Sequence, residues 1–397
     1  MKVLHVIPAI ASRYGGPSQA IYTMCRALQE QGIDLLIATT NADGDGELSV
    51  RLSDTIVYQD VPTIFFDRQF SEALKYSRPL AEWLDQHIVD FDLVHIHAVF
   101  SHACVAAARA CRKHRIPYIV RPLGTLDPWS LKQKQFRKQL FWHFGVKQML
   151  RCADAIHYTT ADEKRLAESE LGLGNGIVIP NGIDLGLARH CPERAANVVR
   201  GITEPALRST YVLALSRIHP KKGYELLIEA FAQLKKQVAL SDWHLVIAGD
   251  GEPAYVEQLK TLAEQVGLTG DAHFVGWLEG DRKESALQGA ALMALPSFQE
   301  NFGISLIEAM ACGVPVLVSP QVNLAPDIAA AEAGWIAELN QEDLARVLAE
   351  AMGNEHERQR RGAQGRQLAQ NFGAEHVATK LMHLYRSLIE NRYSQSN

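Results

Sequence analysis

Arg217 and Lys222 lie in one short loop of the second half of the chain, in the segment SRIHPKKG (216–223). The loop follows an apolar run, and Gly223 opens the amphipathic segment after it. Two cations beside the first turn of a helix attract an anion, because that turn also carries unpaired backbone N–H groups. A solvated basic turn is the alternative, and Lys221 fits that description. The order Ser-Arg-x-x-x-x-Lys-Gly favours phosphate binding by Arg217 and Lys222.

Two carboxylates flank the start of a predicted helix in the segment SFQENFGISLIEAMACGVPVLVS (297–319). Glu300 precedes Gly303, where the helix is expected to begin, and Glu308 lies about one and a half turns further on. The amides of the first turn can bind an anion, and the carboxylates can accept hydrogen bonds from hydroxyl groups on either side of it. A diphosphate between a sugar and a ribose has this layout, whereas two surface glutamates on a capped helix would leave Gly303 unexplained. The residues placed at the helix start are Asn301, Phe302, Gly303, Ile304 and Ser305.

Glycines follow two further predicted strands of the second half. Gly249 comes first in GDGE, and Gly276 precedes Trp277 in FVGW. Glycine lets a ligand approach the backbone closely, although Gly249 on its own also fits a plain turn. A nucleotide base lying against the Gly276–Trp277 edge could be recognised by backbone amides, as adenine and uracil often are.

Glycines also follow predicted strands of the first half. Gly15 and Gly16 stand in SRYGGP, where the following proline suits the first turn of a helix. A tight turn is one interpretation, and a loop that approaches a ligand is the other. Gly124 ends RPLG and again permits close approach of a substrate. Arg121 in the same segment pairs either with an anion or with an internal carboxylate, and the sequence leaves both open.

Two histidines share one face of a predicted strand end in DLVHIHAVFSH (92–102). His95 and His97 point the same way because side chains alternate along a strand. A metal site would need a third ligand, for which His102 is the nearest candidate. The other interpretations are a histidine that hydrogen-bonds a polar substrate and a histidine buried in the core.

The residues above fall at the ends of predicted strands, where parallel α/β sheets bind ligands. Short apolar runs alternate with amphipathic segments throughout, which is typical of βαβ units. The expected fold class is α/β, with two Rossmann-like doubly wound domains. The expected strands are 3–9, 35–40, 93–99, 118–122, 155–159 and 177–180 in the first half, and 212–216, 245–248, 273–275, 292–295, 315–319 and 335–337 in the second.

An irregular stretch, 184–208, reads as the linker between the two domains. We expect a first domain over residues 1–190, a second over 191–374, and a C-terminal helix and tail over 375–397. The tail has apolar residues near helical spacing, so its helix could pack back on the first domain.

Composition excludes several classes of protein. The 397 residues carry a formal net charge of −5, so no overall basic field favours nucleic acid. No apolar run reaches transmembrane length. The six cysteines are scattered without a C-x-x-C pair, which suits a cytoplasmic protein and argues against a zinc site. Neither half has a G-x-G-x-x-G after its first strand, which counts against a nicotinamide dehydrogenase.

A basic, aromatic segment stands apart from these motifs. LKQKQFRKQLFWHFGVKQMLR (131–151) has several Lys and Arg residues and no acid, with aromatic residues near helical spacing. Such a helix can lie on an anionic membrane surface, or it can be a domain helix with a solvated basic face. The first interpretation places the protein at the inner face of the membrane.

Taken together, the motifs resemble the large family of retaining glycosyltransferases with the GT-B fold, family 4. The resemblance spans nearly the whole chain, and SRIHPKKG, AGDGE, FVGW and ENFGISLIEAMACGVPVLVS occur in the family's order. In the first half, GGP, HIH and IPNGID also fit. The resemblance implies two domains facing across a cleft, the first on the acceptor side and the second binding the nucleotide sugar.

The resemblance also implies roles for individual residues. Arg217 and Lys222 would hold the donor diphosphate, Glu300 the hydroxyls of the donor sugar, and Glu308 the ribose. His97 would touch the transferred sugar, and Gly16 would approach the sugar or the diphosphate. Many members have Pro-His-Gly where this chain has Arg-Pro-Leu-Gly, and this departure leaves the acceptor contacts open.

The expected donor is a UDP-sugar, with a GDP-sugar as the alternative, and no metal or cofactor is expected. The expected acceptor is a saccharide or a lipid-linked saccharide, as in exopolysaccharide biosynthesis. Two rival functions remain at this point. One is a nucleotide-sugar epimerase or hydrolase on the same fold, and the other is a non-catalytic nucleotide-sugar-binding protein.

Overall fold

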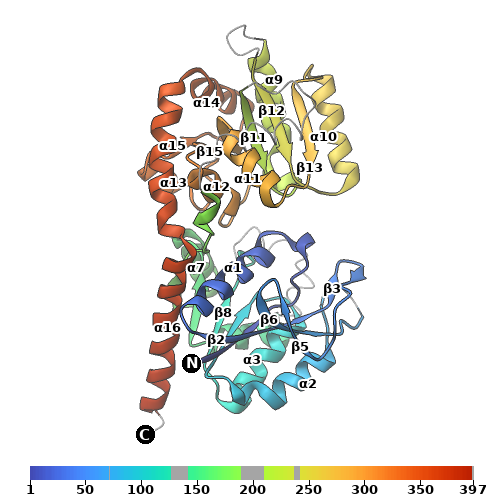
Figure 1. Cartoon of the computed structure of the whole chain (residues 1–397), viewed down its shortest axis with the longest axis vertical. Coiled ribbons are helices and arrows are strands. Elements are labelled where there is room, and N and C mark those ends of the chain that lie inside the picture. The colour runs from blue at the N-terminus through green and yellow to red at the C-terminus, as the bar shows by residue number, and fades with distance from the viewer. Residues whose placement is uncertain (71, 127–141, 189–209, 237–241, 396–397) are drawn as a thin grey trace. The chain divides into compact units, whose positions relative to one another are not determined.

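The computed structural model describes residues 1–70, 72–126, 142–188, 210–236 and 242–395. They form two compact units (Figure 1). Unit 1 consists of Met1–Gly182 together with Ala374–Asn397, and unit 2 consists of Ile183–Gly373. Most of the expected linker, from residue 189 onward, lies outside the described residues. No helix in the described ranges combines the length and the apolar character needed to cross a bilayer.

Unit 1 contains an eight-stranded sheet in the order β10-β9-β8-β7-β1-β2-β6-β5. Neighbouring strands are parallel except β5, which runs antiparallel to β6 at the edge. The strands are β1 (Lys2–Val6), β2 (Asp34–Thr40), β5 (Thr55–Tyr58), β6 (Val61–Phe66), β7 (Leu93–His97), β8 (Tyr118–Arg121), β9 (Ala155–Tyr158) and β10 (Gly176–Val178). A small hairpin, β3 (Ala42–Asp43) with β4 (Gly46–Glu47), follows β2.

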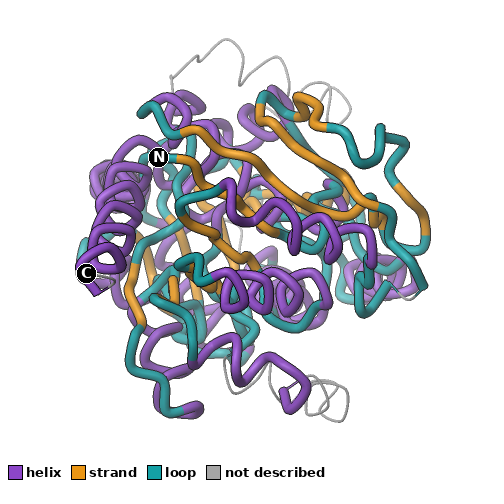
Figure 2. Tube along the Cα trace, turned by 90° about the horizontal axis from the view of Figure 1, so that it is seen from below, coloured by secondary structure: helices purple, strands orange, loops and turns teal. Residues whose placement is uncertain are grey.

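Helices cover both faces of this sheet, as the purple helices around the orange strands show in Figure 2. One core lies between the sheet and α1 with α16, and the other lies under α2 and α3. The C-terminal helix α16 packs along α1, with Val377, Leu381 and Tyr385 buried, which confirms that it returns to the first domain. The helices of unit 1 are α1 (Gly16–Glu30), α2 (Arg78–His87), α3 (His102–His114), α6 (Lys147–Arg151), α7 (Ala161–Leu171) and α16 (Ala374–Gln395).

Unit 2 contains a six-stranded, fully parallel sheet in the order β13-β12-β11-β14-β15-β16. The strands are β11 (Tyr211–Leu215), β12 (His244–Ala248), β13 (Ala272–Gly276), β14 (Leu292–Leu295), β15 (Val316–Val318) and β16 (Gly334–Ile336). The helices are α9 (Tyr224–Lys235), α10 (Pro253–Gln265), α11 (Gly280–Gly289), α12 (Ile304–Ala311), α13 (Ala325–Ala330), α14 (Gln341–Gly353) and α15 (Glu355–Ala369).

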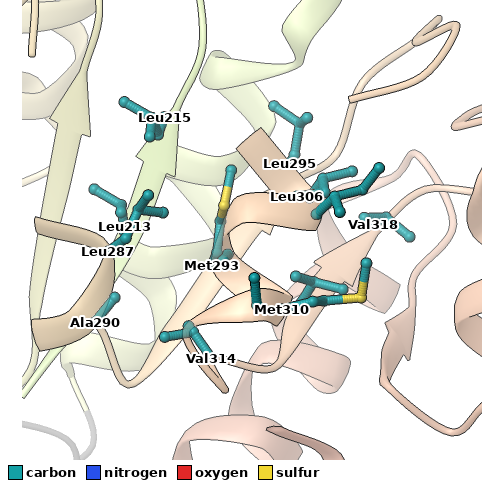
Figure 3. Packing of buried hydrophobic residues seen from close by; sticks show 14 of the residues in the cluster. Leu213, Leu215, Leu287, Ala290, Met293, Leu295, Leu306, Met310, Val314 and Val318 are labelled. Carbon is teal, nitrogen blue, oxygen red and sulfur yellow. The ribbon is translucent and has the colours of Figure 1, made fainter. Parts of the chain in front are cut away.

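Helix α12 is fixed in place by its apolar residues. Leu306 and Met310 lie one turn apart, and both side chains are fully buried. Figure 3 shows them beside apolar side chains of three strands. The labelled strand residues are Leu213 and Leu215 of β11, Met293 and Leu295 of β14, and Val318 of β15. This packing holds the N-terminus of α12 at the carboxyl edge of the sheet.

Both Rossmann-like sheets expected from the sequence are present, and all twelve expected strands occur within a few residues of their expected bounds. The sequence reading missed β3 to β6. Pro62 lies inside β6, and proline counts against a strand because it removes a ladder donor. β6 accommodates it opposite the short edge strand β5, where Pro62 pairs with Val57.

Candidate active site

The loops after β11 and β14 meet where the strand order of unit 2 reverses. The chain proceeds from β11 outward through β12 and β13, then returns to place β14 on the other side of β11. Open α/β sheets bind ligands at the carboxyl edge beside such a switch point. The amide of Phe298 donates to the carbonyl of Lys221 at 2.7 Å, which joins the two loops. Gly223 has a φ of 71°, and a Cβ there would lie 2.1 Å from the carbonyl oxygen of Pro296.

Lys222 and Glu300 form an ion pair between these two loops. Their side chains are 7% and 16% exposed. Burial acts to raise the pKa of the Glu300 carboxyl, but the Lys222 ammonium, with Lys221 and the amide of Phe302, outweighs it, so this pKa lies below its usual value. The two residues predicted to contact a diphosphate and its sugar therefore hold each other in place.

Arg217 lies at the same edge and is exposed. Its side chain forms no ion pair with any residue in the described ranges. The loop backbone around it is held by two hydrogen bonds, from the amide of Ser216 to Ala248 and from the amide of Ile218 to Asp250. The guanidinium is thus available for an anion.

Gly249 and Gly251 have a packing role in this arrangement. A Cβ on Gly249 would lie 1.9 Å from the carbonyl oxygen of Ser216, and one on Gly251 would lie 2.1 Å from that of Ile218. The two glycines let the loop after β12 lie against the loop that carries Arg217. Their immediate neighbour is therefore the backbone of the chain itself.

The N-terminus of α12 presents free amides beside Lys222. Gly303 caps the helix with a φ of 73°, a conformation that favours glycine. The amide of Phe302 hydrogen-bonds the carboxylate of Glu300. The amides of Gly303, Ile304 and Ser305 have no partner among the described residues and remain free for an anion. In the same loop, Asn301 accepts a hydrogen bond from Asn323.

Glu308 takes part in a second ion pair, with Lys283 of α11. The sequence analysis named Glu308 but missed Lys283. Helical segments rich in charge are common on protein surfaces, and nothing in GDRKESAL singles out its lysine. Only the packing of α11 against α12 shows that this lysine meets a carboxylate.

The Gly276–Trp277 edge leaves room for a flat ligand. Gly276 has a φ of 71°, and a Cβ at this position would meet no atom within 4 Å. Trp277 is 37% exposed, and its indole N–H donates to Glu279 at 3.4 Å. The end of β13 is therefore open on the side where a base was predicted.

Four buried histidines lie in unit 1, on the face of the sheet covered by α1 and α16. His157 Nε2 lies 2.7 Å from the carbonyl of Ile179, which can only accept, so this nitrogen carries the proton. His157 Nδ1 therefore accepts from His95 Nε2 at 3.2 Å, and His95 Nδ1 accepts from the hydroxyl of Tyr385 at 2.7 Å. These two rings are neutral, which agrees with the strong lowering of their pKa by burial.

His97 belongs to a second chain of hydrogen bonds. The Arg121 guanidinium donates to His97 Nδ1 at 3.5 Å, so His97 Nε2 donates to Nδ1 of His5 at 3.0 Å. His97 is fully buried and both of its ring nitrogens have partners. The three rings of His5, His95 and His97 are close enough to hold a metal ion, but the buried Arg121 beside them opposes a further cation. His102 lies elsewhere and accepts from the amide of Ser77.

Arg121 is buried and has no carboxylate in direct contact among the described residues. Its guanidinium donates to the side-chain oxygen of Asn181, and burial lowers its pKa to about 10, with Glu163 acting in the opposite direction. Glu163 accepts from the amide of Gly124 at 2.7 Å, so this amide is bonded within the protein. After β1, where the strand order of unit 1 reverses, Gly15 is the N-cap of α1 with a φ of 72°, and Gly16 is the first residue of the helix.

Both halves of the chain match models of known families. Residues 199–368 match the family described as glycosyl transferases group 1, and residues 14–187 match glycosyltransferase family 4. The chain belongs to family 4 of the glycosyltransferases. It is a retaining glycosyltransferase with the GT-B fold, and it uses nucleotide-sugar donors, as the motifs indicated.

Several named proteins resemble this family 4 glycosyltransferase. A D-inositol 3-phosphate glycosyltransferase of Rhodococcus opacus is 26% identical over 307 residues, which cover 76% of this chain and 68% of that protein. A similar enzyme of Corynebacterium efficiens is 28% identical, and 55% of its length is covered. The mannosylfructose-phosphate synthase of Agrobacterium fabrum is 24% identical over 335 residues, with 79% of this chain and 72% of that protein covered.

Solved structures share the fold of the glycosyltransferase over almost its whole length. Anabaena HepE in complex with UDP and glucose has a TM-score of 0.77 at 20% identity, with 98% of this chain and 100% of that chain covered. Sucrose-phosphate synthase from Thermosynechococcus elongatus has a TM-score of 0.78 at 20% identity, with the same coverage. At these identities the likeness shows the fold.

Proposed function

We propose that this glycosyltransferase moves a hexose from a UDP-sugar of the UDP-glucose type to a saccharide or lipid-linked saccharide in polysaccharide or glycoconjugate synthesis. The choice of UDP is supported by the open Gly276–Trp277 edge, and by the UDP and UDP-glucose complexes of Anabaena HepE. A GDP-sugar is the alternative donor.

The observation that carries the proposal is the group of cations and free amides at the switch point of unit 2. The ammonium of Lys222 and the exposed guanidinium of Arg217 belong to the loop after β11, and the amides of Gly303 to Ser305 lie at the N-terminus of α12, which follows the loop after β14. A diphosphate is an anion whose oxygens match these donors. Glu300, in contact with Lys222, is then beside the sugar that the diphosphate carries.

In the proposed mechanism, negative charge builds up on the diphosphate as the glycosidic bond breaks. Arg217, Lys222 and the α12 amides stabilise that charge, and because they are already in place they need little reorganisation. The leaving phosphate accepts the proton of the acceptor hydroxyl, which attacks from the same face and retains the configuration. Since the cations neutralise the leaving group, we expect turnover to continue in EDTA, and loss of activity with rescue by magnesium would contradict this.

The proposal for the acceptor is supported by the named relatives and by the basic segment 131–151. The relatives named above include an inositol phosphate glycosyltransferase and a synthase of a sugar phosphate, so phosphorylated acceptors belong in the first panel. A lipid-linked acceptor is supported by the basic segment 131–151, whose first eleven residues lie outside the described part of the chain. Its described end packs inward, with Val146, Met149 and Leu150 buried.

The test is a panel of nucleotide sugars followed by product analysis. Thermal shift should show the largest stabilisation with a UDP-sugar, and NMR of a reaction with the acceptor panel should show a new linkage with the configuration of the donor. An epimer or free sugar formed from the UDP-sugar alone, with no acceptor product, would favour the epimerase or hydrolase. Stabilisation by GDP-sugars only would show that the donor is a GDP-sugar and not a UDP-sugar.

A further inference from the structure

Lys283 and Glu308 form an ion pair that joins two helices of unit 2. The ammonium nitrogen of Lys283 lies 2.7 Å from Oε1 of Glu308, and the two side chains are 16% and 9% exposed. Lys283 belongs to α11 and Glu308 to α12. Because both groups are largely removed from water, solvent and salt screen their attraction less than in an exposed ion pair.

Lys283 is also close in sequence to the edge predicted to read the base. Helix α11 begins at Gly280, three residues after Trp277, and Glu279 is its N-cap. The amide of Lys283 donates to the carbonyl of Glu279 in the first turn of the helix. One short segment therefore carries the open edge at one end and the partner of Glu308 at the other.

The ion pair leaves Glu308 with one oxygen bound and one oxygen to offer. The ammonium on Oε1 fixes the rotation of the carboxylate, while Oε2 has no partner among the described residues. An ionised carboxylate only accepts hydrogen bonds, and the 2′- and 3′-hydroxyls of a ribose are donors. A pre-oriented acceptor loses less entropy on binding than a free one.

We infer that Lys283 is a positioning residue that makes the site specific for ribonucleotides. It does so by holding the Glu308 carboxylate in a fixed position relative to the Gly276–Trp277 edge, where the base is predicted to bind. The inference rests on the proposed function, in which Glu308 binds the ribose. A purely structural role for the ion pair makes a different prediction. Loss of the pair would then destabilise the fold and would weaken the binding of all nucleotides by the same factor.

The experiment measures the Kd of UDP and of 2′-deoxy-UDP by calorimetry on the full chain. For the unaltered protein we expect UDP to bind about 10- to 100-fold more tightly, since a hydrogen bond to a charged group is lost with the deoxy compound. Lys283→Met should weaken the binding of UDP, so that the Kd values of UDP and 2′-deoxy-UDP become similar. Lys260→Met is the matched control, because Lys260 forms an exposed ion pair with Glu257 on α10, and it should keep the full preference.

Two further variants separate specificity from folding. Lys283→Arg keeps the positive charge and the fold but moves the N–H group that contacts Glu308. Its preference for UDP over 2′-deoxy-UDP should therefore fall between those of the unaltered protein and Lys283→Met. In the Glu308→Gln background, which should itself lack the preference, Lys283→Met should change the Kd ratio no further. A soluble, folded Lys283→Met or Lys283→Arg protein with an undiminished preference would overturn the inference.

The outcomes also separate this inference from the proposed function. If the unaltered chain binds UDP with no preference over 2′-deoxy-UDP, Glu308 does not read the ribose and the inference fails while the donor site stands. If it binds neither UDP nor GDP, the proposed donor site fails, and the inference fails with it.

Discussion

Glu163 is a buried carboxylate whose two oxygens accept three hydrogen bonds. Oε1 accepts from the amide of Gly124, and Oε2 accepts from the amide and the hydroxyl of Thr159, all at 2.7 Å. Leu123, next to Gly124, has a φ of 58°, which is strained for a residue with a side chain. Glu163 thus holds a strained turn at the carboxyl edge of unit 1, where the sequence predicted an acceptor loop.

Replacing this carboxylate with an amide tests that role. Glu163→Gln has the same size, but one side of an amide cannot accept, so at least one buried N–H or O–H loses its partner. We expect a loss of about 2 kcal/mol in the free energy of unfolding, measured with urea. Glu170→Gln, on the exposed side of the same helix, is the control and should change little. Equal effects of the two variants would contradict this account of Glu163.

Residues that stand in a motif could be named as site candidates from the sequence, and residues that meet a distant partner only through packing could not. Arg217, Lys222 and Glu300 stand in short loops with glycines at fixed spacing, and the structure brings them to one edge. Lys283 and Glu163 lie in ordinary helical segments, and their partners are distant in sequence. Only the folded chain shows which carboxylate meets which donor.

At the scale of elements, α16 is tied to the sheet of unit 1 by one buried hydroxyl. Tyr385 donates to His95, which fixes one end of the histidine chain. Helical periodicity predicted that the C-terminal segment is a helix and could return to the first domain. It could not predict this bond, because the spacing of apolar residues does not show which polar group a buried tyrosine meets.

Tyr385→Phe removes the hydroxyl and keeps the ring. We expect a loss of about 1–3 kcal/mol, because Nδ1 of His95 is left without a donor in a site that water does not reach. Hydrogen exchange should rise most in α16 and β7. Tyr255→Phe is the comparison, since its hydroxyl bonds the half-buried Glu225 and water can replace it. A Tyr385→Phe protein as stable as the unaltered one would show that the bond has no net value.

At the scale of the whole molecule, we expect the stability of the two units to depend differently on pH. Burial lowers the pKa of His5 and of His157 to about 3, and the pKa values of His95 and His97 lie well below 6.5. These side chains are neutral in the fold but take up protons in the unfolded chain below its pKa of about 6.5. The contribution is therefore complete above pH 6.5 and is lost as the pH falls below it.

The size of the effect follows from the number of protons. Well below pH 6.5, each histidine lowers the free energy of unfolding by about 1.4 kcal/mol for every pH unit. Four histidines together lower it by more than about 5 kcal/mol per pH unit, which is roughly the whole stability of a small domain. Hydrogen exchange between pH 7.5 and 5.5 should show unit 1 opening before unit 2, whose His244 and His273 are only partly buried. Simultaneous opening of both units, or earlier opening of unit 2, would contradict this.

The most direct test of the donor site compares the Kd of UDP with that of uridine by calorimetry, for the unaltered chain and for Arg217→Ala. If the loops after β11 and β14 hold a diphosphate, UDP binds at least about 100-fold more tightly than uridine, and Arg217→Ala removes about 10-fold or more of that advantage. Equal affinity for the two ligands, or an advantage for UDP that survives the loss of Arg217 unchanged, would contradict the account.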